Sequence, residues 1–118
     1  MRNKKRVDRV TVEKMIEYCE KIEILIQRFG NDFEKFQEDF AFQMSCGMCI
    51  IQIGELTTRL SGDFKEKNSE VEWNRIKGLR NIHVHEYEKV NFDYMLKTLS
   101  EDIPALKESL QKIFEQMN

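Results

Sequence analysis

The closing segment of the chain carries the most regular apolar pattern in the sequence. Between residues 92 and 117, apolar side chains recur at alternating steps of four and three residues. The positions are Phe92, Leu96, Leu99, Ile103, Leu106, Leu110, Ile113 and Met117. A sustained seam of this spacing is typical of a long helix that packs along a neighbouring helix. Pro104 removes a backbone donor inside this segment, so we predict a kink of the last helix at Pro104.

The first half of the chain shows the same helical period twice. Steps of three and four predict one helix from Asp8 to Phe29 with a single buried stripe. Its apolar residues are Val12, Met15, Ile16, Cys19, Ile22, Ile26 and Phe29. Gly30 suits the C-cap of this helix, and Asn31 or Asp32 can cap the next one.

A second helix is predicted from about Phe33 to Leu60, and it is apolar on two faces. One stripe contains Phe33, Phe36, Phe40, Met44, Met48 and Ile51, and the other contains Phe42, Cys46, Cys49, Ile53, Leu56 and Leu60. Such a helix is central to a bundle or shared between a core and an interface. Gly47 and Gly54 lie seven residues apart on one face, where they would let a neighbouring backbone approach closely.

The remaining segments complete an all-α prediction. Residues 61–63 break the pattern, a polar loop follows, and a third helix begins near Ser69 or Glu70. The sequence has one proline and five glycines, which favours long helices with few turns. We therefore predict one domain, residues 1–118, folded as an up-down four-helix bundle.

Charge and composition exclude several classes of protein. The net charge is only −2, so any contact with nucleic acid has to be local or shared with a partner chain. No apolar run approaches the roughly 18 residues that a membrane span needs, so no membrane association is predicted. The basic start of the chain lacks the apolar stretch of a signal peptide. Three cysteines do not suggest a disulfide framework, and a reduced, cytoplasmic setting is expected.

Two further patterns have a structural interpretation beside a functional one. Cys46 and Cys49 form a C-x-x-C pair, which could serve redox chemistry or half of a zinc site. No second pair accompanies them and apolar residues surround them, which favours core packing. The phenylalanines of residues 33–42 could stack nucleic-acid bases, but their helical spacing, with Lys35 as the single basic residue among them, also favours the core.

Both histidines of the chain, His83 and His85, lie in the segment LRNIHVHEYEKV of residues 79–90. As joint metal ligands they are badly spaced, because positions i and i+2 point about 200° apart on a helix. The guanidinium of the nearby Arg80 would also repel a cation. We expect neither a metal site nor a cofactor.

Arg80 and His85 fit phosphoryl chemistry better. A guanidinium can hold a phosphate with two hydrogen bonds and stabilise its developing charge, and histidine can move a proton near neutral pH. The pair suits RNA cleavage in which a 2′-hydroxyl attacks the adjacent phosphate without a metal. Chance also produces the R-x4-H spacing often, and the alternative is a surface arginine with a histidine that caps a helix end.

The string RNIHVHEY, from Arg80 to Tyr87, resembles the R-x4-H-x-Y signature of HepT-like proteins. These belong to the HEPN superfamily of helical ribonuclease domains. The segment IIQIGELTTRLS of residues 50–61 resembles the second long helix of that family. Trp73 ahead of IKGLRN, and the closing SEDIPALKESLQKI, resemble it as well. The resemblance covers nearly the whole chain and implies a helical bundle of HEPN type.

The resemblance also implies a function. Similar proteins are typically toxins of toxin–antitoxin pairs, and they act as homodimers whose two motif copies meet at an RNA-binding cleft. Their usual partner is a minimal nucleotidyltransferase, which neutralises the toxin by transferring AMP to the motif tyrosine. By position, Arg80 and His85 are the catalytic residues, Asn81 is a supporting polar residue, and Tyr87 is the site of AMPylation.

Helix geometry leaves two arrangements for the motif and two interpretations of the protein. Arg80 and His85 would project about 140° apart on one straight helix. Either the helix ends near His83, or the active residues converge across two chains. The chain is then an endoribonuclease, or alternatively a non-catalytic helical subunit that binds substrate or partner in a nucleotidyltransferase complex. A purely structural dimer would leave the Arg80, His85 and Tyr87 cluster without a role.

Overall fold

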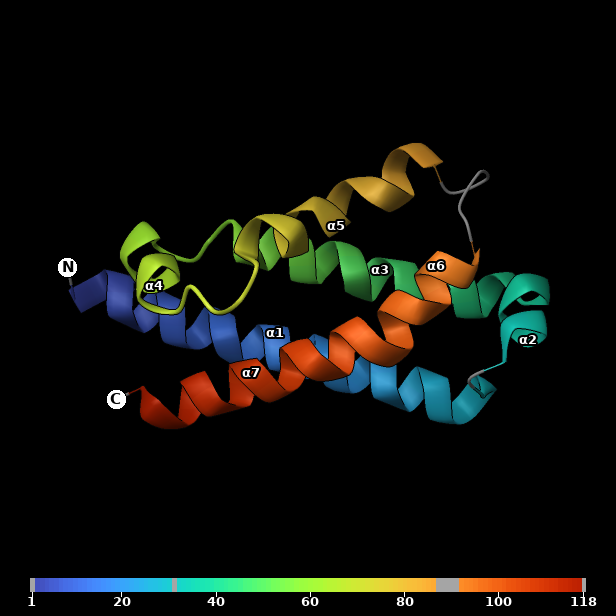
Figure 1. The fold of residues 1–118 in the computed structure, drawn as a ribbon, viewed down its shortest axis with the longest axis horizontal. Coiled ribbons are helices and arrows are strands. Elements are labelled where there is room, and N and C mark those ends of the chain that lie inside the picture. The colour runs from blue at the N-terminus through green and yellow to red at the C-terminus, as the bar shows by residue number, and fades with distance from the viewer. Residues whose placement is uncertain (1, 31, 87–91, 118) are drawn as a thin grey trace.

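The computed structural model describes residues 2–30, 32–86 and 92–117, and these residues form helices without any strand. The four long helices are α1 (Arg2–Phe29), α3 (Phe40–Thr57), α5 (Trp73–Glu86) and α7 (Ile103–Gln116). The shorter ones are α2 (Phe33–Glu38), α4 (Gly62–Lys67), α6 (Phe92–Lys97) and the π-helical segment η2 (Thr98–Asp102). The long helices run back and forth along the molecule (Figure 1). The predicted all-α bundle is confirmed.

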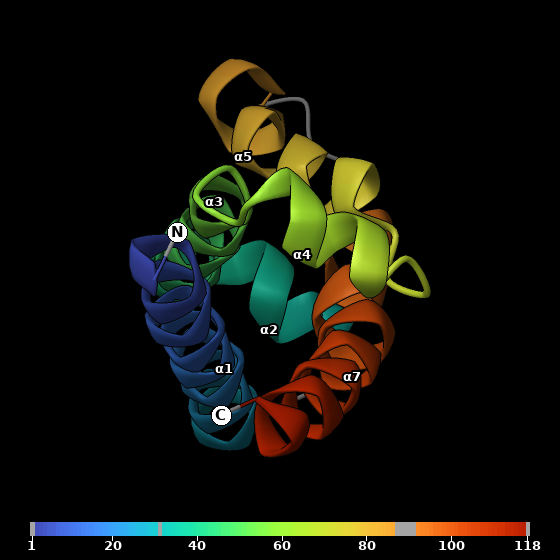
Figure 2. The same cartoon turned by 90° about the vertical axis from the view of Figure 1, so that its left-hand side faces the viewer.

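Helix α3 is the central element of the bundle. It packs against α1 on one side and α5 on the other, and α1 packs in turn against α7 (Figures 1 and 2). Viewed along the bundle, α5 is the outermost long helix, and its main support is α3 (Figure 2). The position of α5 therefore depends chiefly on the side chains of α3.

The end of α1 agrees with the sequence prediction. Gly30 has φ of +90°, and its N–H donates to the carbonyl of Ile26 at 2.7 Å. Glycine adopts this left-handed conformation without steric cost, so it closes the helix. The side chain of Asp32 then accepts from the N–H of Glu34 at 2.8 Å and caps α2.

The prediction of a single helix from Phe33 to Leu60 is wrong, because the structure has two helices, α2 and α3, in this region. Asp39 has extended backbone angles, and it separates α2 from α3. Its carboxylate accepts from the N–H groups of Ala41 at 3.0 Å and Phe42 at 3.1 Å, so it caps the start of α3. The pattern of apolar residues did not reveal this boundary. The side chain of an aspartate can interrupt a helix through local hydrogen bonds while the spacing of the apolar residues stays the same.

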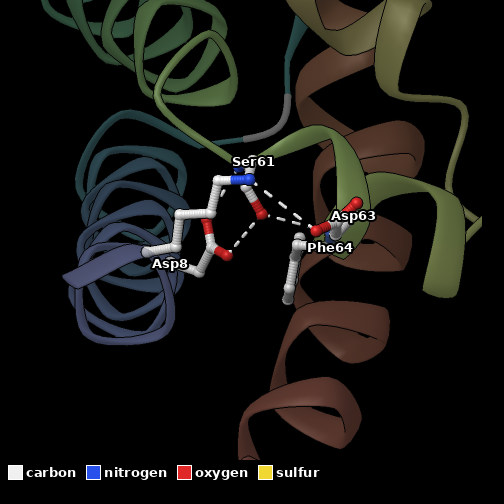
Figure 3. Close-up of polar contacts among 5 residues, drawn as sticks. Asp8, Ser61, Asp63 and Phe64 are labelled. Carbon is white, nitrogen blue, oxygen red and sulfur yellow. Dashed lines mark hydrogen bonds and ion pairs between the residues drawn. The ribbon is translucent and has the colours of Figure 1, made fainter. Parts of the chain in front are cut away.

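The polar loop predicted after residue 63 is also wrong, because residues 62–67 form α4. The hydroxyl of Ser61 caps this helix by accepting from the N–H of Phe64 at 3.2 Å. The buried carboxylate of Asp8 accepts from the N–H of Ser61 at 2.8 Å and from its hydroxyl at 2.7 Å (Figure 3). This network fastens the start of α1 to the connection that leads from α3 toward α5. The predicted start of the third helix near residue 69 is wrong as well, since α5 begins at Trp73.

The last helical segment changes its hydrogen-bond pattern just before Pro104. The N–H of Ile103 donates to the carbonyl of Thr98, five residues back, which is the bond of a π-helix. Pro104 then stands in the first turn of α7, where its missing N–H costs least. The predicted kink of the helix axis at Pro104 itself stays a prediction.

The two apolar faces of the second helical region have different surroundings. One face is buried in the core and contains Phe42, Cys46, Cys49, Ile53 and Leu56. On the other face, Phe40, Met44 and Met48 are 73%, 60% and 56% exposed. The core interpretation of Cys46 and Cys49 is confirmed by their burial. Burial also raises the pKa of Cys46 to about 12, so its thiol stays protonated at neutral pH.

Candidate active site on helix α5

The backbone of Arg80 lies directly against Gly54 of α3. A Cβ added at Gly54 would lie 2.7 Å from the amide nitrogen of Arg80 and 2.9 Å from its Cβ. Only glycine leaves room for this contact, so Gly54 sets how closely α5 approaches α3 at Arg80. The close approach predicted for Gly54 is confirmed, and the same role for Gly47 stays a prediction.

The side chain of Arg80 has a partner on the next residue of α3. Its Nη1 atom lies 3.5 Å from Oε1 of Glu55. The side chain of Arg80 is 32% exposed and that of Glu55 is 50% exposed, so both remain in contact with solvent. The sequence analysis included Glu55 only within the segment of residues 50–61 that resembles the family, and it assigned no role to Glu55. Its position directly after Gly54, on the same turn of α3, is the signal that could have identified it.

The beginning of α5 is anchored by a second ion pair. Nη2 of Arg75 donates to Oδ2 of Asp102 at 2.9 Å, which joins α5 to η2. The charge of Asp102 raises the pKa of Arg75. Together with the contact between Gly54 and Arg80, this pair attaches the first two turns of α5 to the bundle at two points.

The motif residues are distributed along α5 and beyond it. Asn81 is exposed beside Arg80. His83 and His85 belong to α5, but their side chains are not among those described, and Tyr87 lies outside the described residues. The proposal that the helix ends near His83 is wrong, because α5 continues to Glu86. Positions 80 and 85 are consequently separated by about 140° around one helix axis.

Position 80 faces α3. One copy of α5 cannot bring positions 80 and 85 to the same side of the helix. Among the described residues, no cluster of three or more histidine, cysteine or acidic residues could hold a metal ion. No helix in the described part of the chain is long and apolar enough to cross a bilayer. What the described residues supply is therefore an arginine that is accessible to solvent and supported from two neighbouring positions of α3.

Replacing Gly54 with alanine is expected to lower the free energy of unfolding by about 1–3 kcal/mol, as overpacked contacts do. The added methyl group meets backbone atoms of Arg80, which cannot rotate away. Gly78→Ala is the matched control on α5, because its added Cβ would meet no atom within 4 Å beyond the adjoining backbone of its own helix. That control should stabilise the helix by up to about 1 kcal/mol. Urea unfolding followed by circular dichroism measures both changes, and equal stability of the two variants would contradict this packing.

Known proteins are similar to this chain over most of its length. The sequence model of the family described as "Ribonuclease HepT-like" matches residues 15–113, which include the complete motif. A protein named "Putative RNase" from Caldanaerobacter subterraneus is 31% identical over 112 residues, covering 94% of this chain and 97% of that protein. A protein named "Probable ribonuclease HepT" from Thermococcus cleftensis is 32% identical over 91 residues, covering 75% of this chain and 83% of that protein.

No solved structure gives a significant match to the chain. The family match extends from the middle of α1 to the last turns of α7, so it spans all four long helices and not the motif alone. The family match and the helical bundle therefore cover the same residues of the chain. The chain belongs to the HepT-like ribonuclease family.

Proposed function

We propose that this protein is a metal-independent endoribonuclease, and that it acts as the toxin of a toxin–antitoxin pair. The observation that carries the proposal is the placement of Arg80. Its backbone is held by Gly54, while its side chain is one-third exposed to solvent, where a phosphate could approach it. Arginine offers two parallel N–H donors to a phosphate, which suits the transfer of a phosphoryl group.

The proposed reaction uses the 2′-hydroxyl of RNA as the nucleophile. A new bond forms between the 2′-oxygen and phosphorus, the bond from phosphorus to the 5′-oxygen breaks, and a cyclic phosphate remains. A histidine at position 85 takes the proton of the 2′-hydroxyl or gives one to the leaving 5′-oxygen. Arg80 stabilises the charge on the phosphoryl oxygens. Asn81, exposed next to Arg80, supplies a polar contact to the substrate.

Two chains would complete the site. Because positions 80 and 85 lie about 140° apart on α5, a histidine from one chain and an arginine from another can converge where one chain cannot. The apolar stripe on α3 supports the same arrangement. Met44, Met48, Ile51 and Glu55 follow steps of four, three and four, so the exposed stripe leads along one face of α3 to the partner of Arg80.

The protein is accordingly expected to sediment as a homodimer, at about twice the monomer mass of 14.2 kDa. Glutamate at Met44 and Met48 should convert it to a monomer with unchanged helix content, since both side chains are exposed. Ile24→Glu changes a residue of α1 that is 53% exposed, and this control should remain dimeric. Sedimentation of the wild type as a monomer at micromolar concentration would count against the shared site.

Tyr87 is the proposed site of regulation by a nucleotidyltransferase antitoxin. Its phenolic oxygen would attack the α-phosphate of ATP, with pyrophosphate as the leaving group. Incubation with the nucleotidyltransferase and ATP should add one or more AMP groups, which mass spectrometry detects. The added phosphate and bulk would pair with the arginine and block RNA. Tyr87→Phe should abolish the addition and retain cleavage, whereas AMP on Tyr94 or Tyr18 would refute the assignment.

The direct test of the proposed function is cleavage of RNA by the unmodified wild-type protein in excess EDTA. Cleavage that continues without divalent ions supports the mechanism. Cleavage that stops in EDTA and returns with a divalent ion would retain a nuclease but reject this mechanism. Protein that binds RNA or a nucleotidyltransferase without cleaving any RNA would instead support a role as a helical binding subunit.

A further inference from the structure

We propose that Glu55 is a positioning residue that orients the guanidinium of Arg80 for phosphate, an inference that rests on the proposed ribonuclease function. The Oε1 atom of Glu55 lies 3.5 Å from Nη1 of Arg80. The two residues are 25 positions apart in the sequence and belong to different helices. The pair is therefore a product of the packing of α5 on α3.

Arg80 needs such a partner because Gly54 fixes only its backbone. The side chain beyond Cβ has several rotatable bonds, and most of its orientations would miss a bound phosphate. Glu55 directly follows Gly54, so one turn of α3 supplies both the backbone contact and the carboxylate. The distance between carboxylate and guanidinium is consequently set by the same helix packing that places the Cα of Arg80.

The geometry of the pair leaves donors for a substrate. The contact engages Nη1, and a guanidinium carries five N–H donors in a planar fork. The Nε and Nη2 edge can thus receive a phosphate while Glu55 holds the other edge. The side chain of Arg80 is 32% exposed, so part of it is in contact with solvent.

Glu55 should act on binding and on chemistry in opposite directions. Its negative charge repels the phosphate, which weakens binding of RNA in the ground state. Its hold on the guanidinium saves the reorganisation that the transition state would otherwise require. Removing the side chain should therefore lower kcat and KM together. Removing only the charge, as in Glu55→Gln, should lower KM and largely preserve kcat.

The surface pair between Glu72 and Arg75 provides a matched control. Their charged atoms lie 3.6 Å apart, nearly the same distance, but the two residues are three positions apart and Arg75 has its closer contact with Asp102. Glu72→Ala removes the same charge and an equally simple ion pair without touching Arg80. A general effect of acidic residues on RNA binding would appear in both variants.

The experiment is steady-state cleavage of RNA by the dimeric protein and its variants, with circular dichroism on each. Glu55→Ala should lower kcat about tenfold, in the range expected for a misplaced catalytic group, and Glu72→Ala should change it less than about twofold. Glu55→Gln should recover kcat to within about threefold of the wild type. In the Arg80→Ala background, Glu55→Ala should cost less than about twofold, since residues that act as a unit are not additive.

A second measurement does not depend on activity. The Nε–Hε resonance of Arg80, assigned by its absence in Arg80→Lys, should report a more mobile side chain in Glu55→Ala than in the wild type or Glu72→Ala. Wild-type kcat in Glu55→Ala, or an Arg80 resonance of unchanged mobility, would overturn the proposal. If the wild type cleaves no RNA, the proposed function fails while the resonance still decides whether Glu55 positions Arg80.

Discussion

His85→Ala is expected to reduce the rate of RNA cleavage by about 10²- to 10⁴-fold, the usual effect of losing a general acid or base. No other side chain type changes its charge so close to neutral pH without a perturbed environment. Positions 80 and 85 lie about 140° apart around α5, and the substitution is expected to leave the bundle folded. The measurement is single-turnover cleavage in EDTA, with circular dichroism and thermal unfolding of each variant.

His83→Ala is the matched control for this prediction. It removes the same side chain from the same helix, only two residues away. The family motif places no demand on position 83, and a helix turns about 200° between the two positions, so one substrate cannot meet both in the same way. The rate for His83→Ala should remain within about tenfold of the wild type. Full cleavage by folded His85→Ala protein would contradict the role of His85 as the group that transfers the proton.

Most of the bundle could be predicted because apolar periodicity reports which face of a helix is buried. Four residues of the stripe in α1 are fully buried, namely Val12, Met15, Cys19 and Ile22. The seam from Leu99 to Ile113 is buried where the last helices face the core. The conformation of Gly30 followed from its lack of a Cβ. In each of these places the local preference of the residues and the tertiary packing agree.

The helix boundaries that were predicted incorrectly have a common cause. At Asp39 and Ser61 a short polar side chain captures backbone N–H groups and begins a new helix. This local bond does not disturb the spacing of apolar residues, so periodicity alone joins α2 to α3 and misses α4. The π-helical segment before Pro104 is similar, since the change from four to five residues per hydrogen bond leaves the seam of apolar positions intact.

The candidate site was only partly accessible to sequence reasoning. The motif predicted Arg80 and His85 as site residues, and the glycine spacing predicted the close approach that is observed at Gly54. Gly54 and Glu55 both contact Arg80. These two contacts depend on the register between α3 and α5. A register between two helices is a tertiary property, and the pattern of one helix does not contain it.

Arg80→Ala is expected to reduce cleavage by about 10²- to 10³-fold, as the loss of a donor to a developing oxyanion does. Lys77→Ala is the control, because it removes an equal charge from an exposed position of the same helix. General attraction between the protein and RNA would fall in both variants and would weaken further with salt. Only Arg80→Ala should lose rate under saturating RNA, where attraction no longer limits the reaction.

Arg80→Lys separates charge from shape at this position. Lysine retains the positive charge, but it lacks the planar fork that can hold a phosphate on one edge and Glu55 on another. We therefore expect Arg80→Lys to recover RNA binding while its kcat stays at least about tenfold below that of the wild type. Stability should change little in either variant, since the ion pair with Glu55 is partly exposed. Full activity in Arg80→Lys would show that charge alone is required, and the role assigned to the guanidinium geometry would have to be abandoned.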